Sequence, residues 1–149
     1  MFKHILIPTD GSPVANKAAK AGIALAHRLG AKVTAYRAIE DLQPIHGQGY
    51  VFNQKEIDGV EERAGVAGQK HVDAIAKMAK AASVPFASVV AKALTAYEGI
   101  IAAATKRKCD VIFMASHGRR GLSSLIMCSV TQKVLSYSKI TVVVYRTHG

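Results

Sequence analysis

The chain has no tryptophan, only two cysteines and four prolines, and half as many acidic residues as basic ones. The two cysteines, Cys109 and Cys128, are too few for a disulfide framework and lack the spacing of metal ligands. No apolar run approaches the roughly 18 residues of a transmembrane helix. The first run ends at Pro8, which is too short for a secretory signal peptide. These absences predict a reduced, cytoplasmic protein that makes no contact with a membrane.

The excess of basic residues gives a formal net charge of +10, which raises the question of a polyanionic partner. The basic residues are scattered, and the longest cluster, 106–108, falls where we expect a helix to end. Cations are favourable there because they face the negative end of the helix dipole. Aromatic residues are not interleaved with the basic ones, as base stacking would require. We therefore expect no nucleic-acid partner.

Half of the 149 residues are hydrophobic, a content typical of a compact globular protein. A chain of this length can bury a self-sufficient core, so we expect a single domain over residues 1–149. Short apolar runs alternate with stretches of helical periodicity along the chain. The expected strands are 3–7, 32–39, 86–91, 110–115 and 140–145, and the expected helices are 13–29, 55–82, 95–106 and 129–137.

Local signals mark several helix ends. Ser12 followed by Pro13 is typical of an N-cap with proline at the first helical position, and Gly30 is typical of a helix C-terminus. Thr95 followed by Glu98 predicts a capping box. Apolar strands that alternate with helices predict an α/β fold, in which a parallel sheet is covered by helices on both faces.

Ligands of such sheets bind beyond the carboxyl ends of the strands, near a switch in strand order. Two segments are candidates for that edge, 8–11 after the first strand and 116–118 after the fourth. The second belongs to the run MASHGRRGLSSLIMCS at 114–129, which contains residue types of several kinds of site.

A hydrolase or a metal site is weakly indicated by this run. Ser116 or Cys128 could be a nucleophile with His117 as its base, but the G-x-S-x-G elbow is absent. We also expect neighbours on an extended loop to point in opposite directions, which separates Ser116 from His117. Six histidines are spread along the chain without an i, i+4 pair, so a metal site is not favoured.

Phosphate binding is the more strongly indicated chemistry. Gly118 and Gly121 allow the backbone to approach a ligand closely. Arg119 offers positive charge, and Ser129 begins a helix whose N-terminus attracts anions. The spacing matches neither the P-loop nor G-x-G-x-x-G, so a glycine-rich turn with solvated arginines stays open as the alternative.

Four stretches span essentially the whole chain: ILIPTDGS at 5–12, MASHG at 114–118, SVT at 129–131 and ITVVV at 140–144. Together they resemble the universal stress protein family. The resemblance implies a Rossmann-like, five-stranded parallel sheet with the strand order 3-2-1-4-5. It also implies a homodimer in which the strand at 140–145 pairs antiparallel with its copy. That strand is apolar and uncharged, so its edge invites pairing.

Family members that bind ATP resemble one another in the pattern G-x2-G-x9-G-[ST] after the fourth strand. Aligned with this chain, the pattern places Ala115 and Cys128 at the first and third glycines, whereas Gly118 and Ser129 match. Ala115 adds one methyl group. Cys128 puts a larger side chain where the family's glycine lies beside the phosphates, which puts ATP binding in doubt.

The resemblance implies a site for ATP or another adenine nucleotide, with or without Mg²⁺. The segment 8–10 would lie along the adenosine, Ala38 would line the adenine pocket, and Asp10 would meet ribose hydroxyls or a divalent ion. The residues implied at this site are Pro8, Thr9, Asp10, Ala38, Met114, Ala115, His117, Gly118, Arg119, Cys128, Ser129, Val130 and Thr131.

The sequence therefore leaves three functions open. The first is a stress-response regulator that binds an adenine nucleotide. The second is a dimer of the same fold that binds no nucleotide and acts through protein contacts. The third is a slow ATPase, for which Asp10 is the nearest carboxylate and no residue is evidently placed to activate water.

Overall fold

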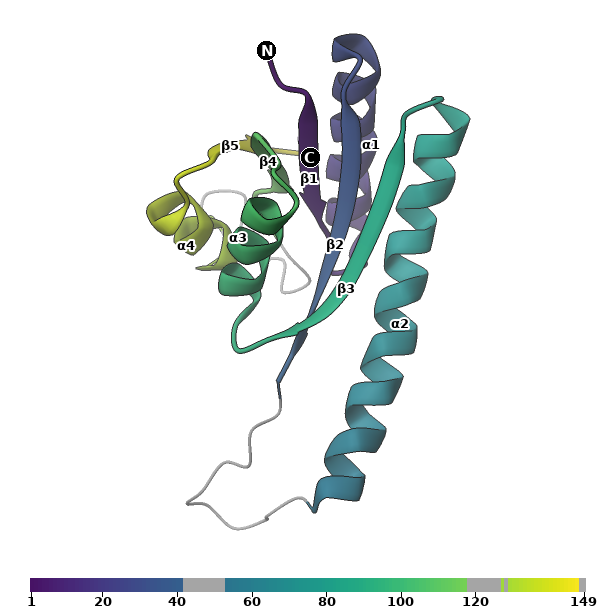
Figure 1. The fold of residues 1–149 in the computed structure, drawn as a ribbon, viewed down its shortest axis with the longest axis vertical. Coiled ribbons are helices and arrows are strands. Elements are labelled where there is room, and N and C mark those ends of the chain that lie inside the picture. Colours follow the sequence, from purple (N-terminus) through teal and green to yellow (C-terminus); the bar gives the residue numbers. More distant parts are fainter. Residues whose placement is uncertain (42–52, 118–126, 128, 148–149) are drawn as a thin grey trace.

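The computed structural model describes residues 1–41, 53–117, 127 and 129–147 (Figure 1). Strands and helices alternate throughout, as the periodicity predicts. The elements are β1 (His4–Pro8), α1 (Pro13–Leu29), β2 (Lys32–Glu40), α2 (Gln54–Ala81), β3 (Phe86–Ala93), α3 (Ala96–Lys106), β4 (Val111–Ala115), α4 (Ser129–Tyr137) and β5 (Thr141–Tyr145). The predicted bounds differ from these by one or two residues at several ends, where helix turns fray and strand pairing stops.

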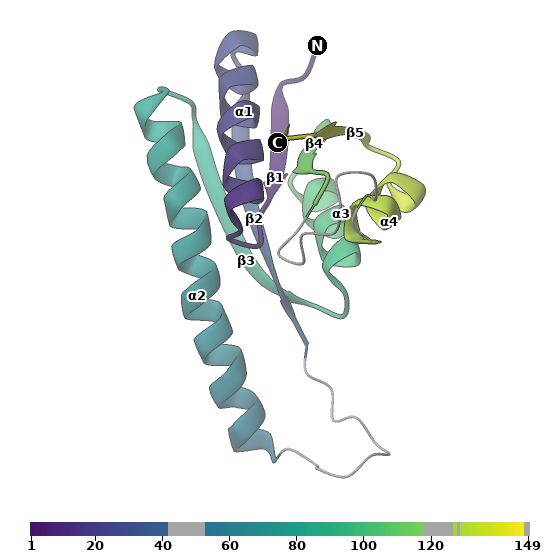
Figure 2. The same cartoon turned by 180° about the vertical axis from the view of Figure 1, so that it is seen from behind.

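The strands form one parallel sheet in the order β3-β2-β1-β4-β5. The predicted fold class and strand order are therefore confirmed. α1 and α2 pack on one face of the sheet, and α3 and α4 on the other (Figures 1 and 2). The central strands are buried on both faces, and β4 is buried at each of its five positions.

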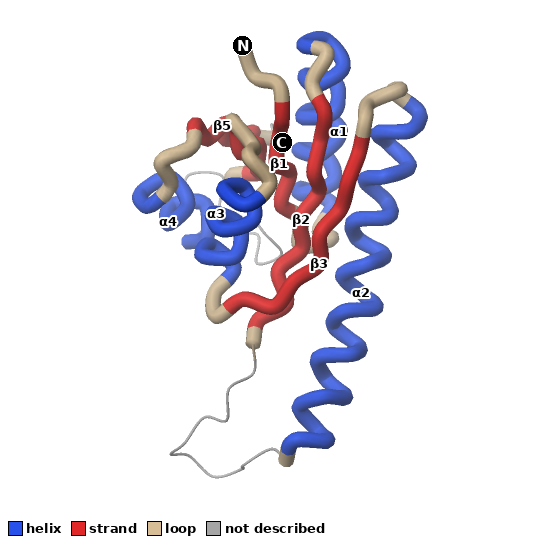
Figure 3. Tube along the Cα trace, in the orientation of Figure 1, coloured by secondary structure: helices blue, strands red, loops and turns tan. Residues whose placement is uncertain are grey.

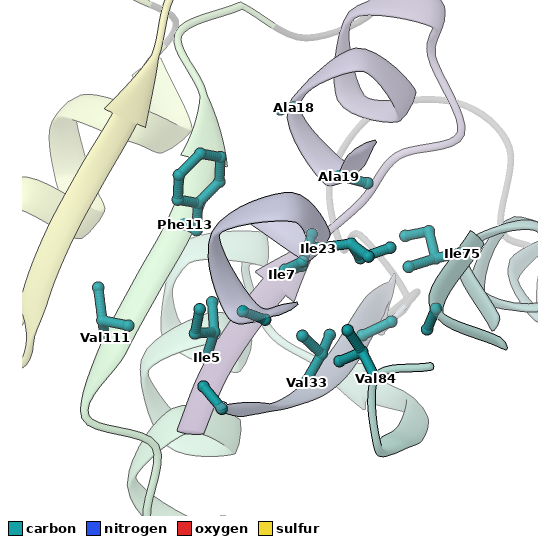
Figure 4. Close-up of a cluster of buried hydrophobic side chains, with 14 of the residues drawn as sticks. Ile5, Ile7, Ala18, Ala19, Ile23, Val33, Ile75, Val84, Val111 and Phe113 are labelled. Carbon is teal, nitrogen blue, oxygen red and sulfur yellow. The ribbon is translucent and has the colours of Figure 1, made fainter. Parts of the chain in front are cut away.

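The larger core cluster lies between the sheet and the helices α1 and α2 (Figure 4). Ile5, Val33 and Phe113 point from the strands toward Ile23 of α1, and Ile75 enters from α2. A second cluster on the opposite face joins β1, β2 and β4 to α3 and α4. Burial of these apolar side chains is the main force that holds the helices to the sheet, and it fixes the positions of the loops at the sheet edges.

The helix ends follow the local signals at α1, and at α3 the predicted N-cap forms without the reciprocal half of the capping box. Ser12 caps α1 by accepting a hydrogen bond from the Ala15 N–H at 3.1 Å, and Gly30 ends the helix in the left-handed conformation. At α3, the Thr95 hydroxyl accepts the Glu98 N–H but donates to the Glu98 carboxylate at 2.7 Å. In a capping box the Glu98 carboxylate would accept the backbone N–H of Thr95. Here it accepts the Thr95 hydroxyl instead. A reciprocal capping box forms at the N-terminus of α2 instead, between Asn53 and Glu56.

A buried histidine at the amino edge of the sheet gives the protein a pH-dependent stability. His4 Nε2 lies 2.8 Å from Thr34 Oγ1. Burial, followed by the charge of Lys32, lowers the pKa of His4 below its ordinary value of 6.5, while Asp110 acts in the opposite direction. Below pH 6.5 the imidazole of His4 therefore binds a proton more readily in the unfolded chain than in the folded chain.

We expect the free energy of unfolding to fall as pH drops from 7.5 through 6.5 toward the lower folded-state pKa. His4→Gln can keep a hydrogen bond to Thr34 but cannot take up the proton, so its stability should depend less on pH. Urea unfolding of both proteins at pH 7.5 and 5.0 measures the difference. Equal losses in the two proteins would assign the pH dependence to other groups.

Within the part of the chain that the structure describes, no helix is long and apolar enough to cross a membrane.

Candidate functional site

The sheet has a gap at its carboxyl edge, because β1 stops before its neighbours. β1 pairs with β2 as far as Pro8, opposite Tyr36, and the Thr9 N–H then donates to the Tyr36 carbonyl. β2 continues to Glu40 (Figure 3). On the other side, β1 pairs with β4 only at Ile5 and Leu6. The gap lies where the chain order reverses, which is the usual place for ligands in such sheets.

Backbone groups of the flanking strands face this gap. Alternate residues of a parallel strand turn their N–H and C=O toward the same neighbour. Tyr36 faces β1, so Ala38 faces the space beyond the end of β1. Its carbonyl accepts a hydrogen bond from Arg37 Nη1 at 2.8 Å. Across the gap, the Ala115 carbonyl accepts from Thr131 Oγ1 at 3.0 Å. Side chains therefore satisfy a carbonyl on each flanking strand.

The gap opens into a hollow at the carboxyl edge of the sheet, which is the usual place for a ligand in such folds. The hollow contains nine of the residues that the sequence predicts: Pro8, Thr9, Asp10, Ala38, Met114, Ala115, His117, Val130 and Thr131. Five further residues, which the sequence analysis did not single out, also line the hollow: Ala15, Tyr36, Arg37, Ala96 and Ile100. Apolar side chains make up most of this lining, so the hollow can take a flat apolar ring.

Arg37 and Tyr36 were missed because their pattern resembles that of an ordinary strand. Tyr36 is buried, and burial raises the pKa of its hydroxyl, so the group stays protonated. Arg37 lies against Gly68 of α2, where a Cβ would come within 3.0 Å of its side chain. An arginine in the middle of an otherwise apolar strand is the signal that could have identified it.

Asp10 reaches the hollow from a loop that is held by local hydrogen bonds. Its Oδ1 accepts the Ser12 N–H at 2.9 Å, and Thr9 Oγ1 accepts the Gly11 N–H at 3.0 Å. Gly11 has a φ of +77°, and a Cβ there would overlap the ring of His71. The carboxylate is therefore oriented by a tight loop that is packed against α2.

The expectation that Ser116 and His117 point in opposite directions is wrong. Ser116 Oγ lies 2.7 Å from His117 Nδ1, because the backbone leaves the extended conformation after Ala115. Ser116 is nevertheless only 1% exposed, so a substrate cannot reach its hydroxyl. A buried hydroxyl next to a base does not form the accessible nucleophile that acyl transfer requires.

The remaining predicted residues are placed only in part. Ser129 begins α4, so its N–H belongs to the helix N-terminus, although its side chain does not line the hollow. Gly118, Arg119 and Cys128 lie outside the described residues. Their roles beside a phosphate stay predictions from the sequence.

Other chemistries find little support in the described segments. There, no group of three or more His, Cys, Asp or Glu residues could hold a metal ion. Cys109 is buried at the opposite edge of the sheet, and burial raises the pKa of its thiol to about 11. A thiol that stays protonated at neutral pH is a poor nucleophile. The hollow is thus the best-formed site of the described chain.

Comparisons with known proteins agree with this architecture. The model of the universal stress protein family matches residues 1–146. Universal stress protein MJ0531 of Methanocaldococcus jannaschii is 30% identical over 146 residues, which are 98% of this chain and 83% of the relative.

Among solved structures, the hypothetical protein MJ0577 superposes with a TM-score of 0.85 at 22% identity, covering 100% of this chain and 99% of its own. A universal stress protein in complex with cAMP gives 0.72 at 16% identity, with 99% and 98% covered. Another from Archaeoglobus fulgidus, in complex with dAMP, gives 0.62 at 13% identity, with 97% of both chains covered. At these identities the likeness shows the fold.

The family match covers nearly the entire chain, and the sheet order is the one that the resemblance implied. This chain belongs to the universal stress protein family.

Proposed function

We propose that this protein binds ATP or another adenine nucleotide in the hollow at the carboxyl edge of its sheet, and that it acts as a regulator in the stress response. The observation that carries the proposal is the mainly apolar hollow at the switch in strand order, with a carboxylate at one wall. Two structural neighbours are complexes with the adenine nucleotides cAMP and dAMP, which supports the same ligand class here.

The lining suggests how a nucleotide would lie. Ala38, Ile100 and Met114 provide an apolar slot for the base, and the Ala38 N–H faces the same space. The first turn of α4 is tied to the end of β4 by the bond from Thr131 to the Ala115 carbonyl. The N-terminus of a helix favours a phosphate. Asp10 then lies between base and phosphate, where it can accept hydrogen bonds from ribose hydroxyls or hold Mg²⁺.

Calorimetric titration with ATP, with and without magnesium, tests this proposal. Asp10→Asn is the matched variant, because its amide oxygen can still accept the Ser12 N–H that orients the loop. Loss of a charged hydrogen-bond acceptor should weaken binding by about tenfold or more. If Asp10 meets the ribose, the loss should occur with and without magnesium; if it holds the ion, only with magnesium.

The melting temperature of Asp10→Asn in the absence of nucleotide provides the control for folding. Equal dissociation constants for the two proteins would remove Asp10 from the site. Neither heat nor a thermal shift at millimolar ATP in the wild-type protein would refute nucleotide binding itself. Cys128 would then be the first residue to suspect, since it replaces the family's third glycine.

We also propose that the protein is a homodimer paired through β5, and that it works in the cytoplasm. β5 is the outer strand of the sheet, next to β4, and its four residues from Val142 to Tyr145 are only partly buried. An apolar edge without a charged residue favours pairing with a second strand. We propose no covalent catalysis by Ser116 or Cys109, because Ser116 is buried and Cys109 stays protonated.

A further inference from the structure

The Ala38 carbonyl at the edge of the hollow is held by the side chain of the preceding residue. β1 ends at Pro8, and the Thr9 N–H then donates to the Tyr36 carbonyl. Two residues further along β2, Ala38 turns its N–H and C=O toward the space beyond the end of β1. Its carbonyl accepts a hydrogen bond from Arg37 Nη1 at 2.8 Å. One of the two backbone groups that Ala38 offers to the hollow therefore has a partner within the chain.

The same two backbone groups form the pair that an adenine ring would match. Adenine has a ring nitrogen that accepts a hydrogen bond beside an amino group that donates one. The N–H of Ala38 could serve the nitrogen, and its carbonyl could serve the amino group. With Arg37 on that carbonyl, however, the amino group meets a guanidinium, which has donors but no acceptor. The positive charge there also repels the amino hydrogens from the second lone pair of the oxygen.

Packing against α2 keeps the stem of Arg37 in this position. The stem lies against Gly68, where a Cβ would come 3.0 Å from Arg37 Cγ and 3.3 Å from Val90 Cγ1. The missing side chain of Gly68 thus leaves the space through which Arg37 runs. A hydrogen bond from a charged donor is roughly twice as strong as one from a neutral amino group. A base that displaced the guanidinium would lose more at this carbonyl than its amino group gains.

We propose that Arg37 sets the base specificity of the hollow by holding the Ala38 carbonyl, so that the site takes purine nucleotides without reading the 6-amino group of adenine. This inference rests on the proposed function and names the class of base that the same site accepts. Arg37 acts on the base through Ala38, so it is a positioning residue.

Two nucleotides that differ by one amino group test the proposal. They are AMP and purine riboside 5′-monophosphate, which has a hydrogen atom in place of the 6-amino group. AMP should bind the wild-type protein at most about threefold more tightly than this analogue, because the amino group finds no free acceptor. Calorimetric titration gives both dissociation constants, and their ratio is the quantity compared below.

Arg37→Met should raise this ratio by at least about fivefold, as expected for one hydrogen bond gained between the amino group and the released carbonyl. Methionine keeps an unbranched apolar stem against Gly68 but has no donor. Arg37→Lys is the second variant. It keeps the positive charge, but its ammonium ends one bond short of Nη1, so it should raise the ratio as well. A purely structural role of Arg37 would not change the ratio, since altered packing affects both nucleotides alike.

Each other outcome has a definite meaning. A wild-type protein that binds neither AMP nor ATP would refute the proposed function, and this inference with it. If the wild type binds AMP more than about threefold more tightly than the analogue, nucleotide binding stands and the inference alone is wrong. A ratio that is unchanged in both folded variants would also overturn the inference, because the amino group then does not meet the Ala38 carbonyl. Melting temperatures without nucleotide show that the variants are folded, and the wild-type ratio tests the proposal without them.

Discussion

Gly11→Ala is expected to lower the free energy of unfolding by about 2–5 kcal/mol, whereas Gly30→Ala lowers it by about 1–2 kcal/mol. Both glycines have positive φ, +77° and +64°, so both substitutions force an L-residue into the left-handed region. They differ in their surroundings. A Cβ on Gly30 meets nothing within 4 Å, but one on Gly11 overlaps the His71 ring. The difference between the two losses of unfolding free energy therefore measures the cost of the overlap with the His71 ring.

Urea unfolding of the two variants measures both losses, and a double-mutant cycle tests the cause. In a His71→Ala background the ring is absent, so Gly11→Ala should cost little more than Gly30→Ala does. Equal losses for the two single variants would show that the His71 ring turns away from the loop at little cost. The folded Gly11→Ala protein should also bind ATP more weakly, because the loop that moves carries Asp10.

This contact shows what the sequence could and could not predict. The alternation of apolar runs with helical stretches predicts the α/β class, and Ser12-Pro13 predicts the start of α1, which the structure confirms. That His71 of α2 lies against Gly11 depends on the angle at which α2 crosses the sheet. Neither periodicity nor local propensity encodes that angle, so the contact was not predictable.

The same reason applies within the hollow. Asp10 follows β1 and Ala38 lies near the carboxyl end of β2, so a parallel sheet brings them to one edge. Arg37 and Tyr36 line the hollow because β1 ends earlier than β2. Pro8, the last residue of β1, pairs with Tyr36, and β2 continues for four more residues. The length of β1 relative to β2 is a property of the folded sheet. The contact between Ser116 and His117 depends likewise on how the backbone turns after β4.

The largest expected change in assembly comes from a single backbone N–H on β5. The Tyr145 carbonyl accepts the Ser116 N–H at 3.0 Å, so Tyr145 faces β4. Alternate residues face the same side, so Val143 also faces β4, whereas Val142 and Val144 turn their N–H and C=O toward the free edge. A second copy of β5 would pair with these two residues.

Val144→Pro removes one outward N–H while it leaves the bonds between β4 and β5 in place, and proline is tolerated at such edge positions. A symmetric dimer loses the N–H twice and leaves two partner carbonyls unpaired. We expect the dimer dissociation constant to rise by at least about thirtyfold. Val144→Ala is the matched control, because it shortens the same side chain but keeps the N–H, so it should stay dimeric.

Light scattering at micromolar concentration measures the outcome directly. The wild type and Val144→Ala should have twice the 15.8 kDa mass of one chain, and Val144→Pro should approach the single-chain mass. Circular dichroism must show that Val144→Pro stays folded, which the intact pairing of β4 with β5 predicts. A wild-type protein with the mass of one chain would refute the dimer. A Val144→Pro protein whose dimer dissociation constant equals that of the wild type would place the interface on another surface.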